Sequence, residues 1–167
     1  GKVMSLLGDF SRQGRLADLI EYLRRLRSNA EWPEIESSPP TEVRLPIHAI
    51  PYRRNPNFTG REQLLQDIYD SLHAGQSTTL TQAITGLGGV GKSQLAVEYT
   101  YRFAGDYDLI WWIRSETEES LYSDFIDLAE ALDVSVAANT ENIVFVNLVY
   151  DWLKKNPVRW LLIFDNA

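Results

Sequence analysis

Hydrophobic residues from about residue 61 onward follow two spacings that alternate along the chain. Short apolar runs, typical of buried strands, occupy residues 80–85, 109–113 and 159–164. Apolar residues three or four positions apart, typical of amphipathic helices, recur over residues 61–73, 93–103, 118–132 and 141–155. Because strands and helices alternate, the pattern predicts an α/β fold in which a mainly parallel sheet is covered by helices on both faces.

The first part of the chain has a different pattern. Residues 2–28 are predicted to form two helices, of which the second carries one apolar face made of Leu16, Leu19, Ile20, Leu23 and Leu26. We expect residues 1–35 to be a helical adaptor element and residues 36–46, rich in Pro and Ser, to be a linker. Such a short helical pair buries little surface alone. It is therefore the end of a larger helical domain, a hairpin docked on a partner, or an extension that packs on the following domain.

A glycine-rich stretch joins the first predicted strand to the next helix. Residues 86–93, Gly-Leu-Gly-Gly-Val-Gly-Lys-Ser, match the phosphate-binding P-loop pattern G-x-x-x-x-G-K-[ST]. Its glycines let backbone N–H groups turn toward an anion, and the helix N-terminus adds partial positive charge. Lys92 is expected to reach the β- and γ-phosphates, and the Ser93 hydroxyl to bind Mg²⁺. A chance match in a glycine-rich turn is the alternative, and the flanking strand and helix disfavour it.

Polar residues end or follow the other two predicted strands. The carboxyl ends of parallel strands lie at one edge of the sheet, where ligands bind. Asp165 follows the last strand, and we expect it to hold Mg²⁺ directly or through water; on its own, such an aspartate often only caps the next helix. Arg114 ends the preceding predicted strand, which begins at residue 109. A γ-phosphate is within its reach, but a solvent-exposed or capping arginine is the favoured interpretation.

Composition and charge narrow the possible partners. The net charge of −7 argues against a nucleic-acid surface, and the absence of cysteine excludes disulfides and thiolate metal sites. No apolar run reaches membrane-spanning length, so we expect no membrane partner. The absence of cysteine is compatible with a cytoplasmic protein, which is the location we expect. His48 and His73 lack a nearby cluster of acids or thiols and are not expected to be ligands. Trp111 and Trp112 are expected to pack on opposite faces of their strand.

Three blocks of sequence together resemble a known family. They are Asn-Pro-Asn-Phe-Thr-Gly-Arg-Glu at 55–62, Gly-Leu-Gly-Gly-Val-Gly-Lys-Ser-Gln-Leu-Ala at 86–96, and Leu-Leu-Ile-Phe-Asp-Asn-Ala at 161–167. The chain resembles the NB-ARC family of STAND P-loop ATPases, and is most similar to its bacterial and fungal branch that bears tetratricopeptide repeats. The resemblance implies that residues 47–167 are the N-terminal part of a P-loop NTPase domain, a three-layer sandwich truncated after the Walker B strand. Residues 2–35 resemble small helical adaptor domains that bridge to effector enzymes.

The resemblance also implies a set of site residues. In this family the segment corresponding to 58–61 lines the adenine pocket, with the arginine near the base. The residues expected to bind ATP or ADP are Phe58, Thr59, Gly60, Arg61, Gly86, Leu87, Gly88, Gly89, Val90, Gly91, Lys92, Ser93 and Gln94. Lys92 and Asp165 are the expected catalytic residues, and Ser93 and Asp165 the expected Mg²⁺ ligands. Asn166 stands where many P-loop ATPases have a second acid, so we expect slow ATP hydrolysis.

The expected function is a nucleotide-dependent switch in a larger signalling or defence protein. ADP would bind in the resting state, and ATP would permit self-assembly. Because the chain begins without Met and stops just after a strand, we expect it to be a segment, with partner contacts through the N-terminal helices and through C-terminal repeats outside it. One alternative is a transcription regulator built on the same ATPase module. The other is a P-loop enzyme with fast turnover, such as a small-molecule kinase, which would need a substrate site and a catalytic base.

Overall fold

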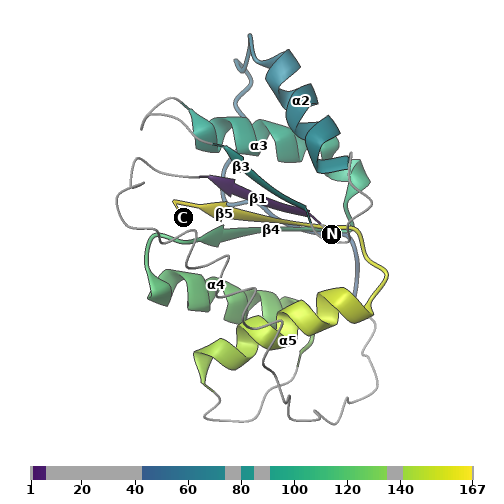
Figure 1. Cartoon of the computed structure of the whole chain (residues 1–167), viewed down its shortest axis with the longest axis vertical. Helices are drawn as coiled ribbons and strands as arrows, with labels where there is room; N and C mark the ends of the chain where they lie inside the picture. Colours follow the sequence, from purple (N-terminus) through teal and green to yellow (C-terminus); the bar gives the residue numbers. More distant parts are fainter. Residues whose placement is uncertain (1, 7–42, 74–79, 85–90, 135–140, 167) are drawn as a thin grey trace.

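A five-stranded sheet forms the centre of the molecule. The computed structural model describes residues 2–6, 43–73, 80–84, 91–134 and 141–166 of the 167-residue chain. The strands, in chain order, are β1 (Lys2–Leu6), β2 (Ile47–Ala49), β3 (Leu80–Ile84), β4 (Leu109–Arg114) and β5 (Trp160–Asp165). They lie in the order β2-β4-β5-β1-β3, and every neighbouring pair is parallel. All the carboxyl ends therefore meet at the same edge, where the C-terminus also lies (Figure 1).

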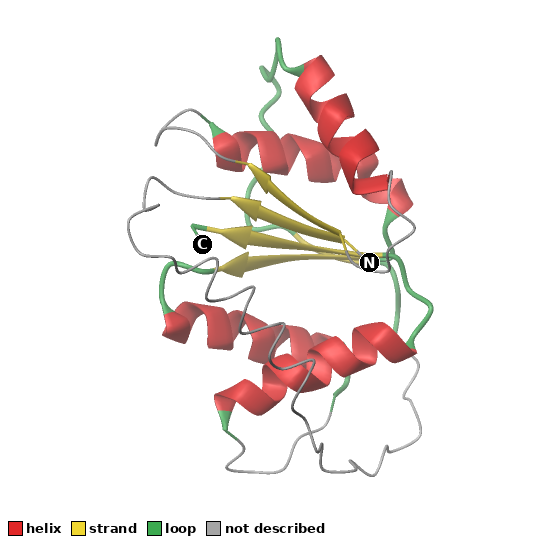
Figure 2. Cartoon of the chain, in the orientation of Figure 1, coloured by secondary structure: helices red, strands yellow, loops and turns green. Residues whose placement is uncertain are grey.

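Helices cover both faces of this sheet. Helices α2 (Glu62–His73) and α3 (Lys92–Phe103) lie on one face, and α4 (Glu118–Ala131) and α5 (Asn142–Lys155) lie on the other (Figures 1 and 2). A short 3₁₀ turn at Ala104–Asp106 leads from α3 into β4. Thr117 caps α4. Its side chain accepts a hydrogen bond from the Ser120 backbone N–H, and the Ser120 side chain accepts one from the Thr117 backbone N–H. The predicted three-layer α/β architecture is confirmed, and the four helix ranges agree with the hydrophobic spacing to within a residue or two.

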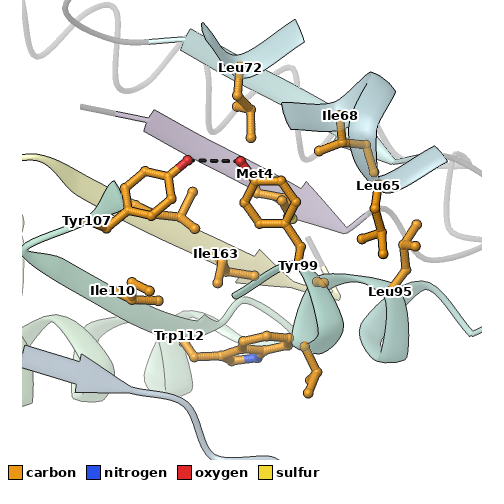
Figure 3. Packing of buried hydrophobic residues seen from close by; sticks show 13 residues of the cluster. Met4, Leu65, Ile68, Leu72, Leu95, Tyr99, Tyr107, Ile110, Trp112 and Ile163 are labelled. Carbon is orange, nitrogen blue, oxygen red and sulfur yellow. Dashed lines mark hydrogen bonds between the residues drawn. The ribbon is translucent and has the colours of Figure 1, made fainter. Parts of the chain in front are cut away.

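The two faces of the sheet pack into two separate apolar clusters. One joins α2 and α3 to the sheet and includes the buried Trp112; the other joins α4 and α5 to it, with the partly buried Trp111 against it. The two tryptophans thus lie on opposite faces, as a strand's alternation requires. In the first cluster the hydroxyls of Tyr99 and Tyr107 are 2.9 Å apart (Figure 3). Burial raises the pKa of Tyr107 to about 12, so the pair remains protonated at neutral pH.

Two strands lie where the hydrophobic pattern predicted something else. Lys2–Leu6 forms β1, between β3 and β5, whereas the sequence predicted helix over residues 2–28. Met4 is fully buried there. Five residues are too few to distinguish the helical spacing from the strand spacing, and pairing with two neighbouring strands satisfies the backbone groups of β1. Ile47–Ala49, for which the hydrophobic pattern predicted neither a helix nor a strand, pairs with β4. The helices expected over residues 7–28 and the linker expected over 36–42 lie outside the described residues, so the division at residue 35 stays a prediction.

Candidate functional site

Asp165 and Ser93 meet at the carboxyl edge of the sheet. The pairing register places Ile84, Leu6, Asp165 and Arg114 side by side on adjacent strands. Asp165 ends β5 and is only 4% exposed, and Ser93 lies in the first turn of α3. Although 72 positions separate the two residues, Ser93 Oγ donates a hydrogen bond of 3.1 Å to Asp165 Oδ1. A hydroxyl and a carboxylate that are both expected to bind a metal are therefore in contact.

Gly91 and Lys92 form the junction through which the chain enters α3. Gly91 has φ of 78°, in the left-handed region that favours glycine. A Cβ atom built on Gly91 would lie 3.5 Å from Arg61 Nη1, so the Arg61 guanidinium lies against this junction. Lys92 is the first residue of α3, and Gln94 follows Ser93 in its first turn. Residues 86–90, which complete the predicted P-loop, lie outside the described residues.

Tyr52 is a site residue that the sequence analysis missed. Its hydroxyl lies 3.5 Å from Asp165 Oδ2, the carboxylate oxygen that Ser93 does not contact. Partial burial, and then the nearby charge of Asp165, raise the pKa of Tyr52, so the phenol stays protonated and acts as the donor. Nothing in the local sequence distinguishes this tyrosine, because it lies in a segment of irregular hydrophobic spacing.

The segment 50–61, which we call the strap, crosses from β2 to α2 and is tied to α3 by polar contacts. Arg54 donates two hydrogen bonds, of 3.0 and 2.8 Å, to the carboxylate of Glu98, which is 3% exposed. Glu98 also accepts from Arg102, one helical turn further along α3. The Tyr101 hydroxyl donates to the backbone oxygen of Tyr52 at 3.2 Å. The strap is therefore held beside the site by α3, the helix that also carries Lys92 and Ser93.

Phe58, Thr59, Gly60 and Arg61 occupy the end of the strap. Phe58 is partly buried and packs against the cluster under α2 and α3, while the next three residues are exposed. Gly60 has φ of 82°, which explains glycine at this turn into α2. Of the four, Arg61 approaches the P-loop junction at Gly91. Arg61 at the end of the predicted base-binding segment is thus a neighbour of Gly91, the first described residue of the predicted P-loop.

Glu98 is expected to contribute strongly to the stability of the strap. Replacing it with glutamine preserves its shape but removes the charge that pairs with two arginines, and should lower the free energy of unfolding by about 1 to 2 kcal/mol. Hydrogen bonds from Arg54 are the largest cause that lowers the pKa of Glu98 below its ordinary 4.5, and burial opposes them. This stabilisation is therefore fully present above pH 4.5 and is lost as the pH falls through the lowered pKa.

Denaturant unfolding of both proteins at pH 7 and at pH 3 measures this effect. The difference between wild type and Glu98→Gln should be large at pH 7 and should shrink at pH 3. Glu130→Gln, an exposed glutamate on α4, is the matched control and should leave stability nearly unchanged. Equal stability of wild type and Glu98→Gln at pH 7 would contradict the role of this ion pair.

Arg114 is engaged by α4 rather than by the site. Its guanidinium donates to both carboxylate oxygens of Asp124, the closest contact being 2.6 Å, and its backbone N–H donates to Asp124 Oδ2 at 2.7 Å. The Arg114 side chain is 60% exposed, which agrees with the solvent-exposed arginine, one of the two interpretations favoured from the sequence. His48 Nε2 contacts the backbone oxygen of Tyr107 at 3.1 Å, and His73 stacks on Tyr69. In the described ranges no three His, Cys, Asp or Glu residues gather in a way that would hold a metal ion.

Comparison with known proteins gives a significant similarity. The chain is 30% identical over 124 residues to a nucleotide-binding leucine-rich repeat (NLR)-like protein from Hyaloscypha variabilis. The aligned part is 71% of this chain but only 12% of that protein. No family model matches the chain, and no solved structure matches it. The comparisons therefore support an NLR-like relationship. Within the described residues, no helix has both the length and the apolar character needed to cross a bilayer.

Proposed function

We propose that this chain binds an adenine nucleotide together with Mg²⁺ at the carboxyl edge of the sheet. The observation that carries the proposal is the hydrogen bond between Ser93 and Asp165, which joins the helix after the P-loop sequence to the buried acid at the end of β5. Lys92 precedes Ser93 at the start of α3, where the helix dipole favours negative charge. The nucleotide phosphates would lie at this helix end, against the Gly91 backbone.

The pair Ser93 and Asp165 has the chemistry that Mg²⁺ requires. Both side chains offer hard oxygen atoms, and the ion keeps several waters and the substrate phosphates as its other ligands. Adjacent ligands of an octahedral Mg²⁺ with bonds of 2.0–2.1 Å are about 2.9 Å apart. The observed separation of 3.1 Å is close to that value, so Ser93 and Asp165 fit neighbouring positions around one ion, or one ligand and one partner of a metal-bound water. The ion would neutralise charge on the phosphates.

The strap supplies the proposed base-binding side of the site. Phe58, anchored in the core cluster, would present an apolar surface to the adenine, while Thr59 and Gly60 shape the turn beside it. Arg61 lies at the junction of this loop with Gly91, within reach of both the base side and the phosphate side of the nucleotide. Contacts from the strap to α3 would hold this side of the site in place before a ligand binds, which would reduce the entropic cost of binding.

The biological role that we infer is a nucleotide-dependent switch in a signalling or defence protein. This inference draws on the name of the Hyaloscypha variabilis relative, a nucleotide-binding NLR-like protein, and on the resemblance to NB-ARC ATPases. Exchange of ADP for ATP would change contacts at the sheet edge and so favour one of two arrangements of a larger protein. Self-assembly and recruitment of protein partners would follow in the ATP-bound arrangement. Slow hydrolysis would return the protein to rest.

Isothermal titration calorimetry with ADP, ATP and GTP tests the binding proposal. We expect the 167-residue chain to bind ADP and ATP, to bind them more tightly with Mg²⁺ than with EDTA, and to bind GTP more weakly. A chain that folds but binds none of these nucleotides at millimolar concentration would refute the proposal. Equal affinity for ATP and GTP would retain the phosphate site but remove the assignment of an adenine pocket.

A further inference from the structure

Two hydroxyl groups from different parts of the chain approach the carboxylate of Asp165. Ser93, on α3, donates to Oδ1, and Tyr52, on the strap, points at Oδ2. The carboxylate is nearly buried, and a buried charge requires polar partners on its oxygens. We propose that Tyr52 is a positioning residue for the metal-binding carboxylate: its hydroxyl fixes Oδ2, so that Asp165 keeps one orientation toward Ser93 and the ion. This inference rests on the proposed Mg²⁺–nucleotide site.

The position of Tyr52 is set by three contacts that do not involve Asp165. Its ring meets Trp112 edge-on, with 5.1 Å between ring centroids and 74° between planes. Its backbone oxygen accepts from Tyr101 on α3, and two positions later Arg54 is paired with buried Glu98. A tyrosine that is 40% exposed would otherwise be free to turn into solvent. These contacts aim its hydroxyl at the carboxylate before any ligand is present.

The distance between Tyr52 and Asp165 sets the size of the expected effect. At 3.5 Å the contact is longer than the 2.5–3.0 Å of ordinary hydroxyl hydrogen bonds, so it is weak in this ligand-free geometry. Hydrogen bonds of this kind tighten when the ligand binds. Loss of a partner that orients a metal ligand typically lowers metal affinity 10- to 100-fold. For this long contact we expect a smaller loss, about threefold to tenfold.

Tyr52→Phe tests the role of the hydroxyl, because it removes one oxygen and keeps the ring on Trp112. ADP affinity is measured by calorimetry at a series of Mg²⁺ concentrations and in EDTA. We expect the Mg²⁺ concentration for half-maximal enhancement to rise about threefold to tenfold, while ADP affinity in EDTA stays unchanged. Tyr150→Phe on α5 removes the same oxygen on the opposite face of the sheet and should behave as wild type.

Three results would overturn the inference while the proposed function stands. First, if the Mg²⁺ requirement of Tyr52→Phe equals that of wild type, the hydroxyl does not orient the carboxylate. Second, if the requirement is lower than that of wild type, the hydroxyl competes with the metal. Third, if ADP affinity falls equally in EDTA, Tyr52 shapes the nucleotide site and not the carboxylate. A wild-type chain without nucleotide binding overturns both this inference and the proposed function.

Discussion

Replacing Lys92 with alanine should weaken the binding of ADP and ATP by about 1.5 to 3 kcal/mol, or roughly 10- to 150-fold. Lys92 is the first residue of α3, directly before the serine that contacts Asp165. Its ammonium group would meet the β- and γ-phosphates, and a hydrogen bond between two charged groups is roughly twice as strong as one between neutral groups. ATP should lose more affinity than ADP, because it has one more phosphate for the ammonium to contact.

Calorimetry of wild type and Lys92→Ala with both nucleotides measures this loss. Lys155→Ala removes the same charge from the last turn of α5, across the sheet from the site, and controls for the change in net charge. Circular dichroism should show that both variants are folded. If Lys92→Ala binds ADP as wild type does, the phosphates do not lie at the start of α3, and the proposed site is wrong.

The positions of Ser93 and Asp165 at one site were predictable from the sequence because two general rules apply to them. The P-loop pattern places its serine at the start of a helix that follows a strand, and Asp165 follows a second strand. In a parallel sheet all the strands end at the same edge, so both residues were expected at that edge. Neither rule depends on the separation of 72 in sequence number, and the structure places the two side chains in contact.

The polar contacts of the strap could not be predicted in the same way. Tyr52 and Arg54 lie in a segment without helical or strand periodicity, so nothing in the sequence indicates what their side chains face. Glu98 lies in a helix where an acid is expected on the exposed side, yet it is buried by the strap that crosses it. Contacts between a loop and a helix 44 positions away depend on the tertiary path of the loop.

β1 shows that a short segment does not reveal its secondary structure through hydrophobic spacing. Lys-Val-Met-Ser-Leu carries too few residues for its spacing to decide between helix and strand, and the leucines further along favoured helix. Its strand conformation comes from backbone pairing with β3 on one side and β5 on the other, and from the burial of Met4. Local sequence preference for strands is weaker than such a context. The element was therefore decided by neighbours that lie more than seventy residues away.

Asn166 should make ATP hydrolysis at this site slow, with a single-turnover rate constant well below the ~1 to 100 s⁻¹ of protein kinases. It directly follows Asp165, is exposed, and has φ of 59°. If Asp165 is committed to Mg²⁺, the neighbouring side chain is the natural one to orient the attacking water. An amide oxygen can accept a hydrogen bond from water, but it cannot take its proton, and help from a general base is worth about 10²- to 10⁴-fold.

The backbone at position 166 decides which substitution tests this explanation. Asparagine and aspartate tolerate the left-handed region better than other residues with side chains, whereas glutamate would add strain there. Asn166→Asp therefore supplies a proton acceptor without disturbing the end of β5, and it should raise the single-turnover rate at least tenfold. Asn142→Asp, at the start of α5, adds the same charge on the opposite face and should leave the rate unchanged. If hydrolysis is slow in wild type and equally slow in Asn166→Asp, the asparagine only accommodates the left-handed backbone at this turn, and the slow rate has another cause. A wild-type rate in the kinase range would instead contradict the switch.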